Sequence, residues 1–408
     1  MLRQRFAAGN SNLRTAYRFH PRFLNMLDTT VSPSRALATQ SHGNRLFGLD
    51  ALRAVAVLLV LFGHTLAHQN PPQWIRWFWG AQGSLGVEIF FVLSGFLIGR
   101  ILLKQLVAGR LVTLRDLKEF LARRWARTLP LYFAFLLLYF RFDYTGVGQL
   151  VTDAPFFVFL QNFYWRPIRF FEHSWSLSVE EWFYLIFPLL LLCAHKLVRS
   201  VDRAFWIAGG IFVLMPLLAR LGQLRHIADW NDFNNLIRMV VVCRLDSIFA
   251  GVFMAYLNVC HARWFRFVGE LAPIGVGSLL VTAFYFACGA PGLSQQPLTQ
   301  VLLFPCISLM IATLIPGALE LRGIDDGPLD RFVTFTSKIS YSLYLGHIAM
   351  LTLVNGIMGI YGWTAPTVSK TLVVYAAYFA CYYAFAYFTY RTVEQPYLKL
   401  RDLTSKVN

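Results

Sequence analysis

An arginine and a histidine, Arg53 and His64, lie eleven residues apart in the first strongly apolar stretch of the chain. On an α-helix, eleven steps end about 20° from three full turns, so the two side chains share one face, about 16 Å apart along the axis. Ionisable groups in apolar helices are costly and usually face a cavity or a partner. A histidine oriented by a carboxylate can act as a general base. His64 is therefore a candidate base, with Arg53 three turns away.

Three glutamates in later apolar stretches could supply that carboxylate. Glu88 lies in the second stretch, and Glu180 and Glu181 lie near the start of the fourth. If the first stretch leaves the cytosol, the second and fourth return to it, which places Glu88 and Glu180 level with His64. A structural role stays open, in which His64 is an interfacial histidine and the paired glutamates complement the dipole of a helix start.

Three further ionisable residues lie in apolar stretches: Arg244, Asp246 and His347. Arg244 and Asp246 are two residues apart and do not face each other on a helix, so separate partners on neighbouring helices are favoured over a mutual salt bridge. His347, taken alone, is more typical of a packed core than of catalysis. All three are candidates for lining a substrate path, and structural pairing stays open.

A basic stretch from Arg100 to Arg127 holds eight Lys and Arg residues and ends in Arg123, Arg124 and Arg127. Cytosolic loops of membrane proteins are rich in such residues, which explains most of it. A cluster this dense at a cavity mouth would also bind phosphate groups. Upstream, Ser94 and the following glycine permit close helix packing, or a bend beside a ligand.

The composition predicts that these residues belong to membrane-spanning helices. Of 408 residues, 57% are hydrophobic and 14% are charged, whereas soluble domains carry about 25% charged residues. We expect an all-α polytopic membrane protein with about ten transmembrane helices and no soluble catalytic domain. The apolar stretch Phe156–Trp165 makes a re-entrant segment plausible and leaves the count open by one around residues 128–175. The predicted spans are 47–67, 83–103, 128–142, 177–195, 205–221, 239–259, 268–289, 299–319, 340–360 and 370–390.

The distribution of charge predicts the orientation of these spans. The 37 Lys and Arg residues against 21 Asp and Glu give a net charge of +16. Placing both termini in the cytosol puts most basic residues on the cytosolic side, as the positive-inside rule requires. Nucleic-acid binding is then unnecessary to explain the charge. We expect a basic tail at 1–45, a membrane domain at 46–396 and a short cytosolic tail at 397–408.

The N-terminal tail and the cysteines add two smaller expectations. Residues 1–45 hold seven arginines and one acid, which is typical of a flexible cytosolic tail, although an organellar transit peptide has a similar composition. The cysteines lack C-x-x-C spacing, so neither a metal site nor a disulfide framework is expected, and we interpret them as packing thiols. They are Cys193, Cys243, Cys260, Cys288, Cys306 and Cys381.

Taken together, the motifs resemble the acyltransferase family 3 membrane proteins, which modify bacterial surface glycans and some secreted small molecules. The resemblance covers nearly the whole membrane domain and follows seven ordered blocks. They are Gly48–Ala54 with the Arg53/His64 spacing, Gly86–Ile98, Arg123–Arg124 with Pro130–Tyr132, Trp175–Tyr184, Arg244–Asp246, Ile339–His347 and Glu394–Pro396.

The resemblance implies transfer of an acyl group, commonly acetyl, from cytosolic acyl-CoA to a hydroxyl of a glycan or lipid-linked glycan in a bacterial inner membrane. Lipopolysaccharide and exopolysaccharide are among the compatible acceptors. Under this interpretation His64 deprotonates the acceptor hydroxyl. The carboxylate that orients the His64 imidazole would be Glu180 or, alternatively, Glu181. The donor phosphates would bind Arg53, Arg123, Arg124 and Arg127. The acceptor or pore would be lined by Glu88, Ser94, Arg244, Asp246 and His347, and no metal is expected.

This chain also departs from the family pattern. Many members place Gln after the paired glutamates and Trp before the last histidine, where this chain has Trp182 and Gly346. Some relatives add an extracytoplasmic hydrolase-like domain, whereas here only residues 391–408 follow the last predicted span. We therefore expect direct transfer to the acceptor, or a separate extracytoplasmic partner protein.

Two other classes of function compete with the acyltransferase. A multi-pass transporter of a glycan or organic anion would also place Arg, Glu and His along its pathway. The lack of a detectable internal repeat counts against it. A purely structural assembly factor would not need so many ionisable groups at matched depths.

Overall fold

The structure is a computed structural model that describes residues 46–67, 73–111, 113–143, 153–163, 170–287, 296–323, 327–360 and 368–399. The tail predicted at 1–45 and residues 400–408 of the predicted C-terminal tail lie outside the described residues. The cytosolic placement of both termini, and the domain limits that depend on it, therefore stay predictions.

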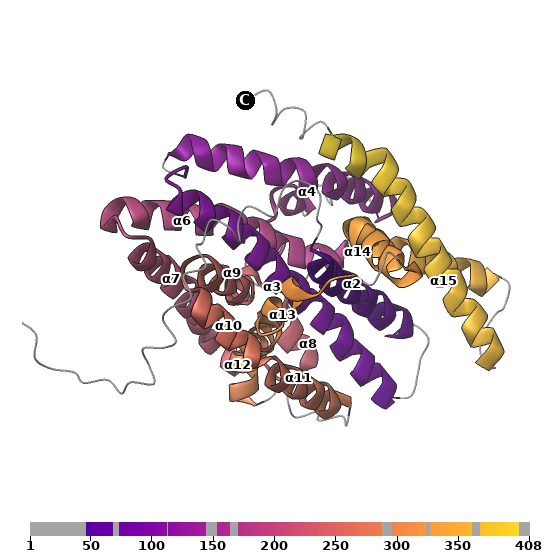
Figure 1. The fold of residues 1–408 in the computed structure, drawn as a ribbon. Helices are drawn as coiled ribbons and strands as arrows, with labels where there is room; N and C mark the ends of the chain where they lie inside the picture. Colours follow the sequence, from indigo (N-terminus) through magenta and orange to yellow (C-terminus); the bar gives the residue numbers. More distant parts are fainter. Residues whose placement is uncertain are drawn as a thin grey trace, which may run out of the picture. The chain divides into compact units, whose positions relative to one another are not determined.

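The described residues form helices and no β-strand (Figure 1). This agrees with the predicted all-α class. The α-helices are α2 Phe47–Ala67, α3 Gln73–Val107, α4 Leu114–Asp143, α6 Trp175–Val198, α7 Val201–Gln223, α8 Trp230–Phe233, α9 Leu245–Cys260, α10 Ala262–Glu270, α11 Ala272–Ala287, α12 Pro297–Ala312, α13 Ile315–Glu320, α14 Pro328–Ile360 and α15 Val368–Thr389. The short 3₁₀ and π segments are η2 Ala154–Val158, η3 Glu172–Ser174, η4 Leu224–His226, η5 Asn234–Arg238, η6 Val241–Cys243 and η8 Tyr390–Glu394.

The predicted count of ten spans is not confirmed. Among the described residues, six helical segments are long and apolar enough to cross a membrane, or seven if α10 and α11, bent by 47°, form one broken span. The stretch predicted at 239–259 yields only the 16-residue α9, which is shorter than the roughly 20 residues a span needs. The six segments are Phe47–Leu66, Gly83–Val107, Glu172–Val198, Val201–His226, Pro297–Glu320 and Pro328–Ile360.

The basic stretch from Arg100 to Arg127 is mostly helical rather than a loop. It comprises the end of α3, a turn at Gly109, which has a positive φ of 66°, and the first half of α4. A capping box begins α4: the Thr113 hydroxyl accepts from the Asp116 N–H at 3.2 Å, and the Asp116 carboxylate accepts from the Thr113 N–H at 2.8 Å. The basic cluster is thereby carried on a rigid element.

Helix α3 lies between α2 and α9, and α14 lies between α2 and α15 (Figure 1). Glycines allow α3 and α9 to touch through their backbones. A Cβ on Gly95 would overlap the carbonyl oxygen of Ile248, and one on Gly251 would overlap that of Val92. The small residue beside Ser94 therefore serves helix packing, the simpler of its two predicted roles, and it holds α3 firmly beside the site.

Candidate active site

A cavity of about 540 Å³ opens among α2, α3, α4, α6 and α14. Its walls are largely apolar side chains of α3, such as Phe90, Leu97 and Ile98. Six residues predicted from the sequence line it: Arg53, Ser94, Arg123, Arg124, Arg127 and Glu180. The structure thus brings together, in one hollow, the four arginines that the sequence assigned to phosphate binding.

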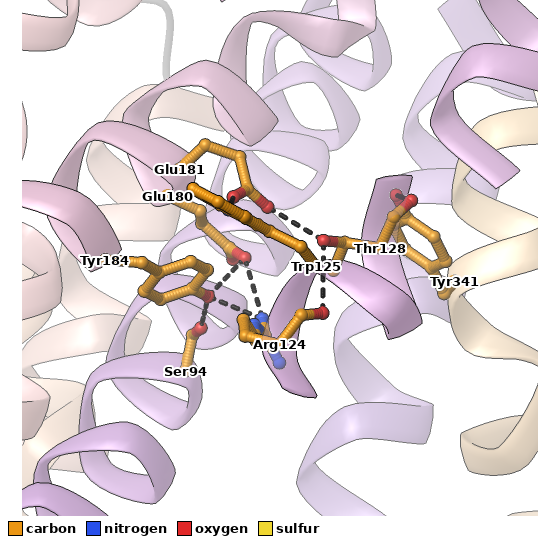
Figure 2. Close-up of polar contacts among 8 residues, drawn as sticks. All are labelled: Ser94, Arg124, Trp125, Thr128, Glu180, Glu181, Tyr184 and Tyr341. Carbon is orange, nitrogen blue, oxygen red and sulfur yellow. Dashed lines mark hydrogen bonds and ion pairs between the residues drawn. The ribbon is translucent and has the colours of Figure 1, made fainter. Parts of the chain in front are cut away.

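Arg124 is held in place by groups on α6 (Figure 2). Its Nη2 donates to the Tyr184 hydroxyl at 2.6 Å and to Glu180 Oε2 at 3.4 Å, and its guanidinium lies 4.4 Å above the centre of the Tyr184 ring. Tyr184 in turn donates to Glu180 Oε2 at 2.6 Å and shares a hydrogen bond with Ser94. This network fixes both the guanidinium and the carboxylate against the cavity wall.

Glu181 also faces α4, through different partners. Its carboxylate accepts from Trp125 Nε1 at 2.9 Å and from the Thr128 hydroxyl at 3.0 Å. The Tyr341 hydroxyl of α14 donates to the Thr128 carbonyl at 2.8 Å, so three helices meet here (Figure 2). Glu181 therefore joins α6 to α4 beside the cavity.

Arg53 reaches the cavity from α2 and is oriented by neighbours at its base. Its Nη1 lies 3.4 Å from Asp50 Oδ1 and 3.4 Å from the Ser337 hydroxyl of α14. The Ser337 hydroxyl donates to the same Asp50 oxygen at 2.6 Å. Asp50 belongs to the same motif as Arg53, Gly48–Ala54. The two residues are three apart on a helix, and this spacing could have predicted their contact.

Three histidines gather beyond one wall of the cavity. The His64 ring lies 5.0 Å, centre to centre, from that of His347, and His173 lies 5.2 Å from His347 on another side. Tyr344, a cavity-lining residue, is 6.0 Å from His173 and 5.9 Å from His347 and shares a 2.6 Å hydrogen bond with Ser176, also in the cavity wall. The histidine group therefore adjoins the arginine-lined cavity.

The carboxylates have partners other than the one expected from the sequence. We expected Glu180, or else Glu181, to orient His64, but their hydrogen bonds lead to Arg124, Trp125, Thr128 and Tyr184. A ring contact joins His64 to the imidazole of His347. The sequence indicated how deep each side chain lies along its helix. It did not indicate which neighbouring helix Glu180 and Glu181 face.

Glu88, Arg244 and Asp246 form a separate, buried group. Arg244 pairs with Glu88 of α3, and Asp246 accepts from Arg220 Nη2 of α7 at 2.6 Å. The Glu88 carboxylate also accepts from the Ser308 hydroxyl of α12 at 3.1 Å. Separate partners for Arg244 and Asp246 were predicted and are confirmed. None of these residues lines the larger cavity.

Sequence reasoning missed several residues of this arrangement. Tyr184 lies four residues after Glu180 and therefore on the same helix face, which is a signal that could have found it. His173 lies two residues before the apolar run that starts at Trp175, and outside every predicted span. Arg220 lies near the end of a predicted span, where basic residues are common and do not by themselves indicate a buried ion pair.

A family described as an acyltransferase domain matches residues 46–391. The chain belongs to the acyltransferase 3 family. This confirms the resemblance seen in the motifs, and the matched region contains every predicted site residue of this acyltransferase 3 protein.

Similar proteins come from Staphylococcus aureus. A provisionally named O-acetyltransferase of strain COL is 27% identical over 385 residues, which cover 86% of this chain and 57% of the relative. The O-acetyltransferase OatA of strain NCTC 8325 is 27% identical over 331 residues, covering 76% of this chain and 51% of OatA. The acyltransferase 3 chain thus spans little more than half the length of these relatives. No solved structure matches the chain significantly.

Proposed function

We propose that the chain is an integral membrane O-acyltransferase that moves an acyl group, most simply acetyl, from cytosolic acyl-CoA to a hydroxyl of a glycan or lipid-linked glycan. The observation that carries the proposal is the adjacency of an arginine-lined cavity and a histidine group. Membership of the acyltransferase 3 family and the names of the O-acetyltransferase relatives support it.

The cavity suits the donor. Four arginines and one carboxylate line it, so its walls carry an excess of positive charge that favours phosphate groups. The apolar side chains of α3 would contact the uncharged arm and the acyl group of an acyl-CoA. A volume of about 540 Å³ lies within the range of roughly 300–1,000 Å³ typical of small-molecule sites.

The histidine group suits the chemical step. His64 lies on α2 about 16 Å further along the helix axis than Arg53, and Tyr344, which lines the cavity, lies 5.9 Å between ring centres from His347. A thioester held by its phosphates near Arg53 would point its acyl end towards His64. We assign His64 as the base that accepts the proton of the acceptor hydroxyl.

The glutamates take a revised place in this proposal. Glu180 and Glu181 hold α4 against α6, and Glu180 together with Tyr184 orients Arg124. We therefore assign Glu180 a role in positioning a donor-binding arginine. The buried pairs of Glu88, Arg244 and Asp246 support the helices that carry the site.

The acceptor side rests on the predicted orientation. With the N-terminus in the cytosol, His64 lies towards the outer end of α2, so the acceptor would enter from the outer face. A bacterial inner membrane and a surface glycan fit this orientation, and a separate extracytoplasmic protein could carry the group onward. Membrane lipid would surround the apolar helices.

The test compares surface glycans of cells that lack the gene with cells that carry wild-type, His64→Ala or His226→Ala protein. His226 is an exposed histidine in the turn after α7 and serves as the matched control. We expect glycan esters, measured by NMR and mass spectrometry, with wild type and His226→Ala and none with His64→Ala at equal membrane abundance. Unchanged ester content with His64→Ala would refute the assignment of the base.

A further inference from the structure

The hydrogen bonds of His347, the imidazole beside His64, determine which of its ring nitrogens carries the proton in the neutral form. His347 Nδ1 lies 2.7 Å from the carbonyl oxygen of Tyr344. A carbonyl only accepts, so in the neutral ring Nδ1 carries the proton and Nε2 carries a lone pair. His347 is 1% exposed, and its Nε2 has no hydrogen-bond partner among the described residues. A buried acceptor of this kind is unusual in a folded protein.

The donors around His347 are already committed to other acceptors. His173 Nε2 lies 3.1 Å from the Leu345 carbonyl, so the proton of that neutral ring is used there. The Tyr344 hydroxyl donates to the His173 carbonyl at 2.8 Å, and the Tyr139 hydroxyl donates to the Leu345 carbonyl at 3.3 Å. The imidazole of His64, 5.0 Å away between ring centres, is a neighbouring group whose ring N–H can serve as a donor to Nε2.

The turn that carries His347 is held rigidly. The Tyr139 hydroxyl of α4 accepts from the Ala349 N–H at 3.0 Å as well as donating to the Leu345 carbonyl, so it bridges the two ends of this turn of α14. The ring nitrogen of His173 braces the same carbonyl. Rigid second contacts of this kind are what a precisely oriented base requires.

From these contacts we infer that His347 is the positioning residue for His64, accepting an N–H of His64 on Nε2 in the role we had expected of a carboxylate. The inference rests on the proposed function. In the reaction, the acceptor O–H gives its proton to the other ring nitrogen of His64 while the oxygen attacks the thioester carbonyl. The C–S bond then breaks, and the proton passes from His64 to the departing CoA sulfur. His347 stays neutral and stabilises the transient imidazolium.

Two matched substitutions test this role. The side-chain oxygen of glutamine can occupy the place of Nε2, whereas asparagine is one methylene shorter and falls near Nδ1. The assay uses purified protein in detergent, acetyl-CoA and unacetylated surface glycan from the deletion strain, with CoA thiol release as the readout. We expect His347→Gln to keep kcat within about fivefold of wild type and His347→Asn to lose about a hundredfold or more. The KM for acetyl-CoA should not change, because the arginines are untouched.

Other outcomes would overturn the inference. Equal, near-wild-type kcat in both variants would show that His64 needs no acceptor at this position. Equal loss in both monodisperse variants would mean that the His347 ring itself accepts the proton or only fills space. A rise in the KM for the glycan with unchanged kcat would indicate that the acceptor hydroxyl, rather than His64, donates a hydrogen bond to His347 Nε2. Failure of the proposed function itself is distinguishable, since the wild-type protein would then release no CoA thiol when acetyl-CoA and the glycan are supplied.

Discussion

The pairs Arg124–Glu180 and Arg244–Glu88 each join an arginine to a glutamate of an apolar helix, yet they occupy different environments. The side chains of Arg124 and Glu180 are 22% and 14% exposed and line the cavity. Those of Arg244 and Glu88 are 0% and 2% exposed, and the Arg244 guanidinium also lies 3.6 Å from the centre of the Phe304 ring. One pair lines the arginine-lined cavity, and the other is almost completely buried.

The difference shows that an ionisable residue in a span is not by itself evidence of a substrate site. The sequence treated Glu88 and Arg244 as pore-lining for that reason. In the structure they connect α3 to the start of α9 and, through Ser308, to α12. A position in the wall of the arginine-lined cavity, rather than charge alone, separates the two kinds of pair.

The largest expected effect comes from breaking the enclosed pair. Glu88→Leu would leave the Arg244 guanidinium buried without its carboxylate, which should cost about 3–5 kcal/mol of stability. Thermal unfolding of the detergent-purified protein measures it. The double change Glu88→Leu with Arg244→Met removes both charges and should recover most of the loss. If the Glu88→Leu protein were as stable as wild type but inactive, Glu88 and Arg244 would instead contact the substrate, as the sequence predicted.

A smaller effect, on donor binding, is expected from the cavity. Arg53→Ala should raise the KM for acyl-CoA about tenfold, because a hydrogen bond to a charged group contributes about 1.5–3 kcal/mol. The unfolding temperature should change little, since Asp50 keeps its bond to Ser337. Arg141→Ala, an exposed arginine of α4 outside the cavity lining, is the control. An acyl-CoA titration identical to wild type would exclude Arg53 as a donor contact.

How far the sequence could predict this arrangement depends on what each pattern encodes. Hydropathy and basic clusters predicted a helical membrane protein, and helical spacing placed Arg53 and His64 on α2. The predicted count of spans is not confirmed, and one reason is that α4 combines both signals: it is basic in its first half and apolar in its second. The long stretch at 239–259 failed because Arg244 and the irregular turn before it shorten the helix that follows.

The partners of the site residues were harder to predict for a geometric reason. Spacing along a helix gives the depth of a side chain and its angle relative to its neighbours, but not which other helix that angle faces. Glu180 and Glu181 were placed near the right depth for the site, yet α6 turns both towards α4. The contact of His64 with His347 depends on the packing of α2 against α14, which no local pattern records.

The smallest effect tests whether Glu180 serves Arg124 or His64. Glu180→Gln removes one negative charge from the cavity, while its amide oxygen can still accept from Tyr184 and Arg124. Because the donor phosphates are negative, their binding should improve by about 1 kcal/mol, and the KM for acyl-CoA should fall about fivefold with kcat nearly unchanged. Steady-state kinetics with varied acyl-CoA measures both constants. Loss of kcat by a hundredfold at constant KM would instead restore Glu180 as the carboxylate that acts on His64, and Arg124 would then need no help from it to hold the donor.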